Sequence, residues 1–207
     1  AMRECQIMDN FTPEKTRVAL ASYYGLVTFV DDLIGKILQV VDQKNLHDNT
    51  QIFYLSDHGD NIGERDFWGK SNFYEESVGV PCIIKGPNIP AGKVCKTPVS
   101  LIDIHPTILQ TAGINLGTKP GASLIDIANA DDDPERLVFS EYHAMGSATG
   151  AFMLRKGHWK FIYYVSMQPQ LFNLFEDPEE LHDLGTDSDC ADIRCEMEAD
   201  LRSICDP

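Results

Sequence analysis

Two side chains that suit a divalent metal stand next to each other in the first third of the chain. Asp57 supplies a hard carboxylate oxygen and His58 supplies an imidazole nitrogen, and both are common ligands of divalent cations. Lys70 follows on the same polar stretch and carries a positive charge that suits an anion. Together, the pair and the lysine predict a site at which a metal ion and an ammonium group act on an anionic substrate.

A short apolar run directly precedes the loop that carries this pair. Residues 52–55 are typical of a buried strand, and Ser56 begins a polar loop directly after it. Ligands of open α/β sheets bind beyond the carboxyl ends of strands, so the position suits a site. Upstream, Thr12 and Pro13 are a strong helix start, and apolar residues recur at helical spacing to about Lys44. A helix that is linked closely to a strand predicts an α/β sheet with parallel neighbours.

Further elements are predicted downstream of this polar loop, which we call the site loop (residues 56–81). They are a strand at 78–84, a short strand at 93–97, a helix at 103–112 with Asp103 as its N-cap, and a polar connector at 120–133. Four strands of an antiparallel sheet then follow at 137–142, 151–155, 159–164 and 170–174, and an amphipathic helix at 189–204. We expect two domains: residues 1–119, which carry the site, and a small C-terminal α+β subdomain of residues 120–207.

The segment SDHGDNIGERDFWGKSNFYEESVGVP, residues 56–81, resembles the metal-binding loop of the sulfatases, within the alkaline phosphatase superfamily. It is most similar to the choline-sulfatase and phosphonate monoester hydrolase branch, in which the metal pair is Asp-His. The stretches YYGLVTFVDDLIGKIL, VSLIDIHPTILQTAGI, SEYHAMG and LFNLFEDPEELHDL fit the same family. The resemblance implies an α/β fold, the C-terminal part of an alkaline-phosphatase-like sheet with flanking helices, followed by a small antiparallel sheet with a helix.

The resemblance also implies roles for single residues. Asp57 and His58 would hold a divalent metal, Ca²⁺, Mn²⁺ or Mg²⁺, and Lys70 would contact the sulfate or phosphate oxygens. Because imidazole is a softer ligand than oxygen, the mixed pair favours Mn²⁺ slightly over Ca²⁺. His143 would border the substrate pocket, with a structural role as the alternative. Gly79 departs from the family, in which relatives often carry Arg at that place.

The family's nucleophile has no counterpart in this sequence. It is a formylglycine made from a Cys or Ser in a C/S-x-P-x-R motif, and no cysteine or serine of the chain stands in that motif. The acidic metal ligands that the family has near its N-terminus are absent as well. We therefore expect formylglycine only in a missing N-terminal part, and we expect the chain alone to be inactive.

Charge and composition exclude several classes of partner. The net charge of −15 disfavours nucleic acid and anionic membranes, and it repels a sulfate ester at long range. No run of about 18 apolar residues occurs, so no membrane span is expected. The chain starts without an apolar signal segment, and its six cysteines lack paired spacings. These features favour reduced thiols and the cytoplasm, with the periplasm as the alternative.

The sequence is compatible with three functions. The first is metal-dependent hydrolysis of a small sulfate monoester, and the second is hydrolysis of a phosphonate monoester or phosphodiester on the same fold. The third is a non-catalytic truncated module. Because a missing N-terminal half would expose apolar surface, we expect the chain either to self-associate or to require that half as a partner.

Overall fold

The computed structural model describes residues 12–114, 117, 120–144 and 147–207. The described residues form two compact units, which we call the C-terminal unit (residues 71–75 and the described part of 90–207) and the site unit (residues 12–70 and 76–89). Segment 71–75 is grouped with the C-terminal unit although both of its ends continue into the site unit. The two units are defined only by which residues pack together, and they do not test where a domain ends along the chain. The domain boundary between residues 119 and 120 therefore stays a prediction.

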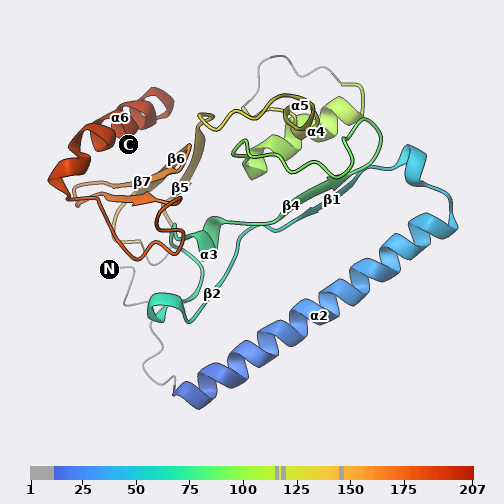
Figure 1. The fold of residues 1–207 in the computed structure, drawn as a ribbon, viewed down its shortest axis with the longest axis horizontal. Coiled ribbons are helices and arrows are strands. Elements are labelled where there is room, and N and C mark those ends of the chain that lie inside the picture. The colour runs from blue at the N-terminus through green and yellow to red at the C-terminus, as the bar shows by residue number, and fades with distance from the viewer. Residues whose placement is uncertain (1–11, 115–116, 118–119, 145–146) are drawn as a thin grey trace. The chain divides into compact units, whose positions relative to one another are not determined.

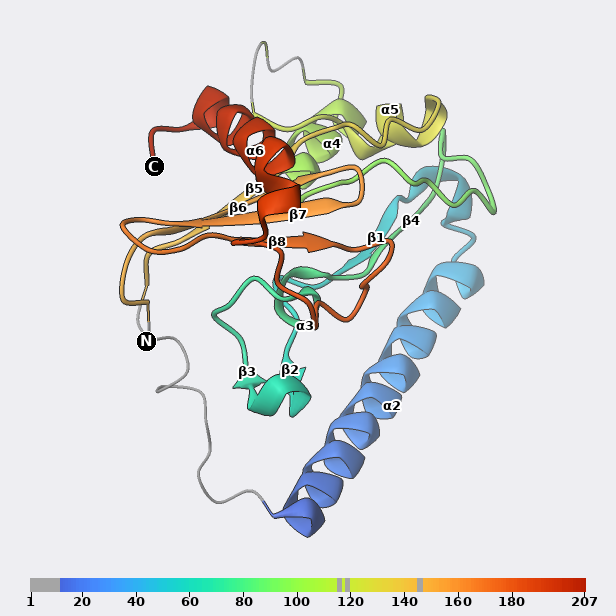
Figure 2. The ribbon, with the colours of Figure 1, turned by 60° about the vertical axis from the view of Figure 1, so that its left-hand side comes forward.

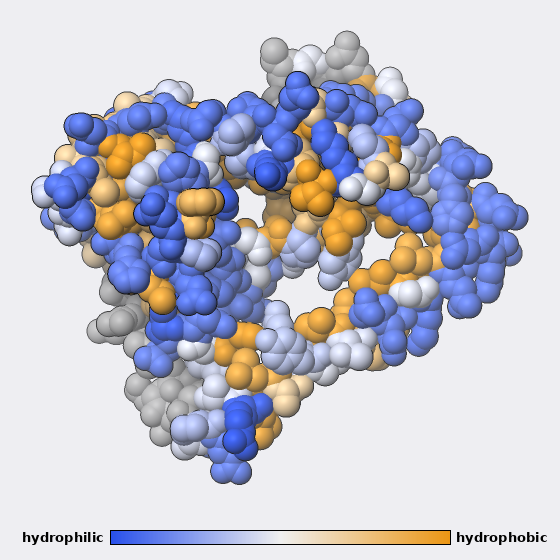
Figure 3. Space-filling view, viewed as in Figure 1, coloured by the Kyte–Doolittle hydropathy of each residue, from blue (hydrophilic) through white to orange (hydrophobic). Residues whose placement is uncertain are grey.

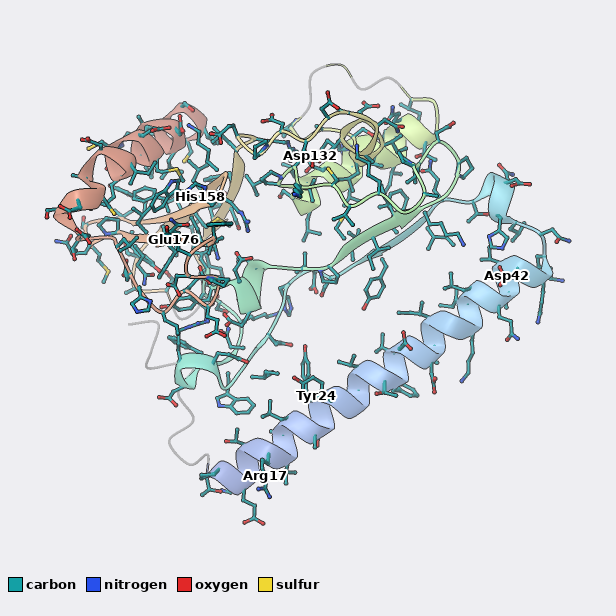
Figure 4. The ribbon with its side chains drawn as sticks, viewed as in Figure 1. Arg17, Tyr24, Asp42, Asp132, His158 and Glu176 are labelled. Carbon is teal, nitrogen blue, oxygen red and sulfur yellow. The ribbon has the colours of Figure 1, made fainter. Side chains whose placement is uncertain are left out.

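The site unit begins with the long helix α2 (Pro13–Gln43), followed by η1 (His47–Asn49) (Figure 1). Its predicted start is confirmed, since the Thr12 hydroxyl accepts a hydrogen bond from the Lys15 amide at 3.3 Å and Pro13 stands in the first turn. None of its residues is buried. Apolar side chains, orange in Figure 3, recur along α2, and Tyr24, labelled in Figure 4, is 61% exposed.

Strand β1 (Ile52–Leu55) pairs with β4 (Cys82–Lys85) in an antiparallel ladder that sets Ile52 opposite Lys85. The expectation of a parallel neighbour is therefore wrong for the strand with which β1 pairs in this chain. The connection between the two strands is the polar site loop rather than a crossover helix, so the chain can return in the opposite direction. The predicted strand at 78–84 begins only after Pro81, which has no N–H to give to a ladder.

The site loop itself is built from short elements. They are β2 (Asn61–Ile62), η2 (Glu64–Asp66), β3 (Trp68–Gly69) and the single-turn helix α3 (Glu75–Val78). β2 and β3 form an antiparallel pair with Asn61 opposite Gly69.

The C-terminal unit contains the predicted four-stranded antiparallel sheet in the order β5-β6-β7-β8. Its strands are β5 (Val138–Tyr142), β6 (Ala151–Lys156), β7 (Trp159–Tyr164) and β8 (Gln170–Asn173). The hairpin between β6 and β7 turns at Gly157, which has a φ of 56° and so takes the left-handed conformation that glycine tolerates.

Helix α6 (Ala191–Ile204), preceded by η4 (Ser188–Cys190), packs on this sheet (Figure 2). Met197 and Leu201 are fully buried in one core with side chains of the sheet, among them Leu154, Phe161 and Leu171. The predicted apolar face is thus confirmed at its centre. Ile204, at the end of the helix, is 44% exposed and does not belong to the buried face.

The rest of the C-terminal unit contains η3 (Leu101–Asp103), α4 (Ile104–Thr111) and α5 (Leu124–Asn129). Asp103 stands at the N-cap position of α4, as predicted, but its side chain makes no capping bond to α4. Its carboxylate instead accepts from the amide of Ser100, the N-cap of η3, at 2.8 Å in a capping box. Residues 93–97, all of them described, run as an irregular loop instead of the predicted strand. The Lys96 amide donates to the side chain of Asp132, labelled in Figure 4, at 3.0 Å.

Candidate metal and anion site

The site loop starts with a turn that is fixed by its own side chains. Ser56 follows β1, and its hydroxyl donates to the His58 carbonyl at 2.7 Å. The Asp57 carboxylate accepts from the His58 amide at 3.1 Å through Oδ1, which leaves Oδ2 for other partners. Such local bonds between short polar side chains and the backbone are typical of turns, and they hold Asp57 and His58 at the end of the strand.

The His58 ring has a defined orientation and tautomer. Its Nδ1 lies 2.9 Å from the Gly59 carbonyl oxygen, which can only accept, so Nδ1 carries the proton. The lone pair is then on Nε2, which lies 2.5 Å from Lys70 Nζ. An imidazole that donates through one nitrogen to a carbonyl and presents a lone pair on the other is the form in which histidine binds metals.

The distance between the two candidate ligands suits a shared ion. Asp57 Oδ2 lies 3.5 Å from His58 Nε2. Oxygen and nitrogen ligands of divalent metals lie at about 2.0–2.4 Å, so one ion can reach both atoms. The Asp57 side chain is 86% exposed and therefore open to a ligand. In the part of the chain that the structure describes, no group of three or more His, Cys, Asp or Glu side chains could hold a metal, so the pair would be part of a larger ligand set.

Lys70 reaches His58 because the β2–β3 hairpin carries it there. Asn61 is fully buried, and its side-chain amide donates to the Gly69 carbonyl at 2.8 Å, immediately before Lys70. Gly69 has a φ of 79°, and Ser71 on the other side has a φ of 82°. A serine in this region is strained by about 1–3 kcal/mol, and such strain persists only where surrounding contacts impose it.

The turn of helix α3 supports the loop from behind. The Gly59 amide donates to the Ser77 carbonyl at 2.8 Å. A Cβ atom at Gly59 would lie 2.0 Å from the Glu76 carbonyl oxygen, so the close approach requires a residue without a side chain. Arg65 forms an ion pair with Glu76, which ties η2 to the same turn. Sequence reasoning missed these supports, although a glycine directly after the Asp-His pair was a signal of close backbone approach.

The structure thus brings Asp57, His58 and Lys70 together, as the sequence predicted for one loop. The fourth candidate, His143, belongs to the C-terminal unit. There its ring packs edge-on against Phe152 at 5.0 Å, and its Nε2 lies 3.4 Å from a carboxylate oxygen of Glu141. Its role at a substrate pocket stays a prediction.

Comparison with known structures identifies the class of fold. A phosphonate monoester hydrolase of Agrobacterium radiobacter is 25% identical with a TM-score of 0.82, and the match covers 94% of this chain and 42% of that chain. A 2-O GAG sulfatase is also 25% identical, with a TM-score of 0.84 over 94% of this chain and 44% of that one. The chain therefore has the alkaline-phosphatase-like fold of these hydrolases.

Sequence comparison narrows the class to a family. The Sulfatase family model matches residues 4–114, and the model of the N-sulphoglucosamine sulphohydrolase C-terminal region matches residues 63–206. The chain belongs to the sulfatase family, whose members usually use a divalent metal. Zebrafish (Danio rerio) arylsulfatase K is 35% identical over 95% of this chain and 39% of its own length. Choline-sulfatase of Rhizobium meliloti is 37% identical over 84% of this chain and 34% of its own length. The chain thus spans less than two-fifths of either relative.

Proposed function

We propose that this chain supplies part of the active site of a metal-dependent sulfuric ester hydrolase. The convergence of Asp57 Oδ2 and Lys70 Nζ on His58 Nε2 carries the proposal. A carboxylate and a neutral imidazole suit a divalent cation, and the adjacent ammonium group suits the anion that such a cation attracts. The family membership and the sulfatase relatives support the same assignment.

In this proposal, Asp57 and His58 hold the ion, which we expect to be Ca²⁺, Mn²⁺ or Mg²⁺. When bound, such an ion polarises a sulfuryl oxygen and neutralises developing negative charge. The Gly59 carbonyl keeps the proton of His58 on Nδ1, so that Nε2, which faces Lys70 Nζ in this structure, carries the lone pair that would act as the ligand. Because two side chains cannot complete the coordination of such an ion, the remaining ligands come from residues outside this pair.

Lys70 has the second role in the proposal. Its Nζ lies 2.5 Å from His58 Nε2, so its N–H donors lie beside the two candidate ligands and would reach the oxygens of an anionic ester bound there. A donor that is already in place when charge develops stabilises the transition state by about 3–4 kcal/mol, or 10²–10³ in kcat. The net charge of −15 disfavours an anionic ester at long range, so this local cation has to offset that repulsion.

The test uses the full-length protein encoded by the reading frame that contains this chain. We expect hydrolysis of an aryl sulfate that is abolished by EDTA and restored by Mn²⁺ or Ca²⁺. Lys70→Met should lower kcat by about 10²–10³-fold, whereas Lys36→Met, on the exposed surface of α2, should leave kcat unchanged. Full activity of Lys70→Met would contradict the proposal.

The phosphonate monoester hydrolase neighbour supports a second candidate, the hydrolysis of phosphonate monoesters or phosphodiesters at the same site. The same residues serve either reaction, because both transferring groups present anionic oxygens to a metal and a lysine. Comparing kcat/KM for phenyl sulfate with that for a phenyl phosphonate monoester decides between them. Absence of turnover with every ester, in a folded protein that binds no metal, would favour a non-catalytic module.

A further inference from the structure

A fully buried lysine lies in the middle of the C-terminal sheet. The side chain of Lys160, on β7, is 0% exposed, and lysine is almost never so buried unless its charge is paired. Its Nζ lies 2.8 Å from the Phe73 carbonyl oxygen, 2.6 Å from Glu75 Oε1 and 2.7 Å from Glu180 Oε1. The ammonium group thus donates a hydrogen bond to the Phe73 carbonyl and forms ion pairs with the two carboxylates, whereas Glu180 Oε1 has no well-aligned hydrogen-bond donor. Leaving such a cation unpaired would be strongly unfavourable, so these contacts hold their partners firmly.

Two of the three partners of Lys160 belong to segment 71–75, and further contacts hold the same segment. The Glu75 amide donates to Glu180 Oε2 at 2.6 Å. Arg155, on β6, lies with its Nη1 3.4 Å from Glu75 Oε2. The cations Lys160 and Arg155 face the carboxyl groups of Glu75 and Glu180; Lys160 and Glu180 are buried, whereas Glu75 and Arg155 are partly exposed. The cluster therefore fixes the backbone of segment 71–75 from two strands and a turn.

Apolar packing adds to this hold. Phe73 is 3% exposed, and the ring of Tyr74 lies 6.0 Å from that of Phe172, which is 1% exposed. Asn72 is also buried, and its side chain accepts from the Tyr74 amide at 3.1 Å. Segment 71–75 is thus part of the core of the C-terminal unit rather than a mobile connector.

Both ends of this segment lead directly to the candidate site. Lys70 precedes it, and the strained Ser71, with its φ of 82°, forms the link. Glu76 and Ser77 follow it, and the Ser77 carbonyl accepts the amide hydrogen bond of Gly59, beside His58. A rigid segment 71–75 therefore sets the chain direction at Lys70 and at the support behind His58 through the covalent backbone.

We propose that Lys160 is the positioning residue of the candidate site, which acts through Phe73 and Glu75 to fix the backbone on either side of segment 71–75. The proposal rests on the proposed function in one respect only, that Lys70 and His58 do the chemistry. Lys160 itself contacts neither substrate nor metal in this proposal. It supplies rigidity, so that the ammonium of Lys70 and the lone pair of His58 stay in place.

The first test is hydrogen–deuterium exchange, which needs no activity. In the full-length protein, Lys160→Met should speed exchange of the amides in residues 71–78 at least about tenfold, because a charged hydrogen-bond anchor is lost. The amides of α6 report whether the C-terminal unit stays folded. Lys156→Met is the matched control: it removes a lysine that pairs with Glu196 and Asp200 on α6 at 2.7 and 2.8 Å. This control should leave exchange in residues 71–78 unchanged.

The second test measures function in the same variants. Well below the melting temperature, Lys160→Met should lower kcat for an aryl sulfate about 10–100-fold with a small change in KM, and should weaken Mn²⁺ binding measured by calorimetry. A residue with a purely structural role would lower the melting temperature but leave kcat per folded molecule unchanged. Lys156→Met should keep kcat and Mn²⁺ affinity at the wild-type values.

The outcomes separate this proposal from the proposed function. If the wild-type protein neither turns over nor binds metal, the proposed function fails, and exchange alone decides whether Lys160 anchors the segment. Unchanged exchange in folded Lys160→Met overturns the proposal, as does faster exchange with unchanged kcat and metal affinity in an active enzyme. If Lys160→Met does not fold, Glu75→Gln replaces it, because the amide oxygen still accepts from Lys160 while the charge is lost. A smaller loosening of residues 71–78 is then expected, and none overturns the proposal.

Discussion

Gly59→Ala tests how closely the metal-binding turn depends on the helix turn behind it. The added methyl group would lie 2.0 Å from the Glu76 carbonyl oxygen, whereas ordinary contact begins at 3.4 Å. The obstacle is a backbone atom, so no side-chain rotation relieves it, and the two segments must separate by about 1.4 Å. That displacement would break the hydrogen bond from the Gly59 amide to Ser77, which is 2.8 Å long.

The magnitude follows from two terms. Overpacking a tight contact costs about 1–3 kcal/mol, and loss of one backbone hydrogen bond adds about 0.5–1.5 kcal/mol. We therefore expect Gly59→Ala to destabilise the protein by about 2–4 kcal/mol. Because the Gly59 carbonyl also orients the His58 ring, a shift of about 1 Å in that turn should lower kcat by about 10²-fold.

Urea unfolding of the full-length protein, Mn²⁺ titration by calorimetry, and kcat with an aryl sulfate measure the three effects. Gly25→Ala is the matched control, since no described atom lies within 4 Å of a Cβ at Gly25 in α2. It should change stability by no more than about 1 kcal/mol, in the stabilising direction that helix propensity favours. Wild-type stability and metal affinity in Gly59→Ala would refute the reasoning, because they would mean that the turn and α3 do not touch as the structure shows.

Three further predictions concern the C-terminal unit, each measured by urea unfolding of the full-length protein. Asp103→Ala should cost about 3–5 kcal/mol, because the fully buried carboxylate pairs with both terminal nitrogens of Arg136 at 2.7 and 3.0 Å, and the arginine would lose that partner. Leu201→Ala should cost about 2–5 kcal/mol, because the side chain is fully buried in the α6 core. Glu180→Gln should gain stability relative to wild type as the pH rises from 4.5 through the raised pKa of Glu180. Burial raises the pKa of Glu180 above its ordinary 4.5 despite Lys160, so the native state binds more protons than the unfolded state, and the wild type loses stability as the pH rises through the raised pKa. A difference in unfolding free energy between Glu180→Gln and wild type that stays constant over this pH range would contradict the raised pKa.

Local signals in the sequence account for most of the elements. The start of α2 follows from Thr12 and Pro13, and the sheet β5–β8 follows from alternating apolar runs and a glycine turn, because these patterns act over a few residues. The clustering of Asp57, His58 and Lys70 was likewise predictable as one loop after one strand. Its geometry, with His58 Nε2 between the other two groups, depends on hydrogen bonds to glycine carbonyls that no residue type encodes.

Long-range pairing explains what the sequence did not predict. The antiparallel partner of β1 depends on how a loop returns, and periodicity within a strand carries no information about direction. The cluster around Lys160 joins residues that are 87 and 105 positions apart, as in its bond to Phe73 and the bond from Glu75 to Glu180. A lysine in an apolar strand pattern gives no sign of its partners, since only the folded chain brings the carboxylates to it.

The exposed apolar residues of helix α2 have two possible explanations, a membrane span or a surface that packs against other protein. By length and composition it could cross a membrane, contrary to the expectation from the sequence, since an 18-residue window has a mean hydropathy of 1.3 and none of it is buried. Its polar residues argue otherwise. At 100° per residue they gather on one half of the helix, and they include Arg17, Asp31, Asp32, Gln39 and Asp42 (Figure 4 labels the first and last). A membrane span is apolar all round, and each central aspartate would oppose insertion by about 2.5–3.5 kcal/mol. Because the Sulfatase model matches residues 4–114, which include α2, we expect its apolar half to pack within the α/β domain of a longer sulfatase-family protein.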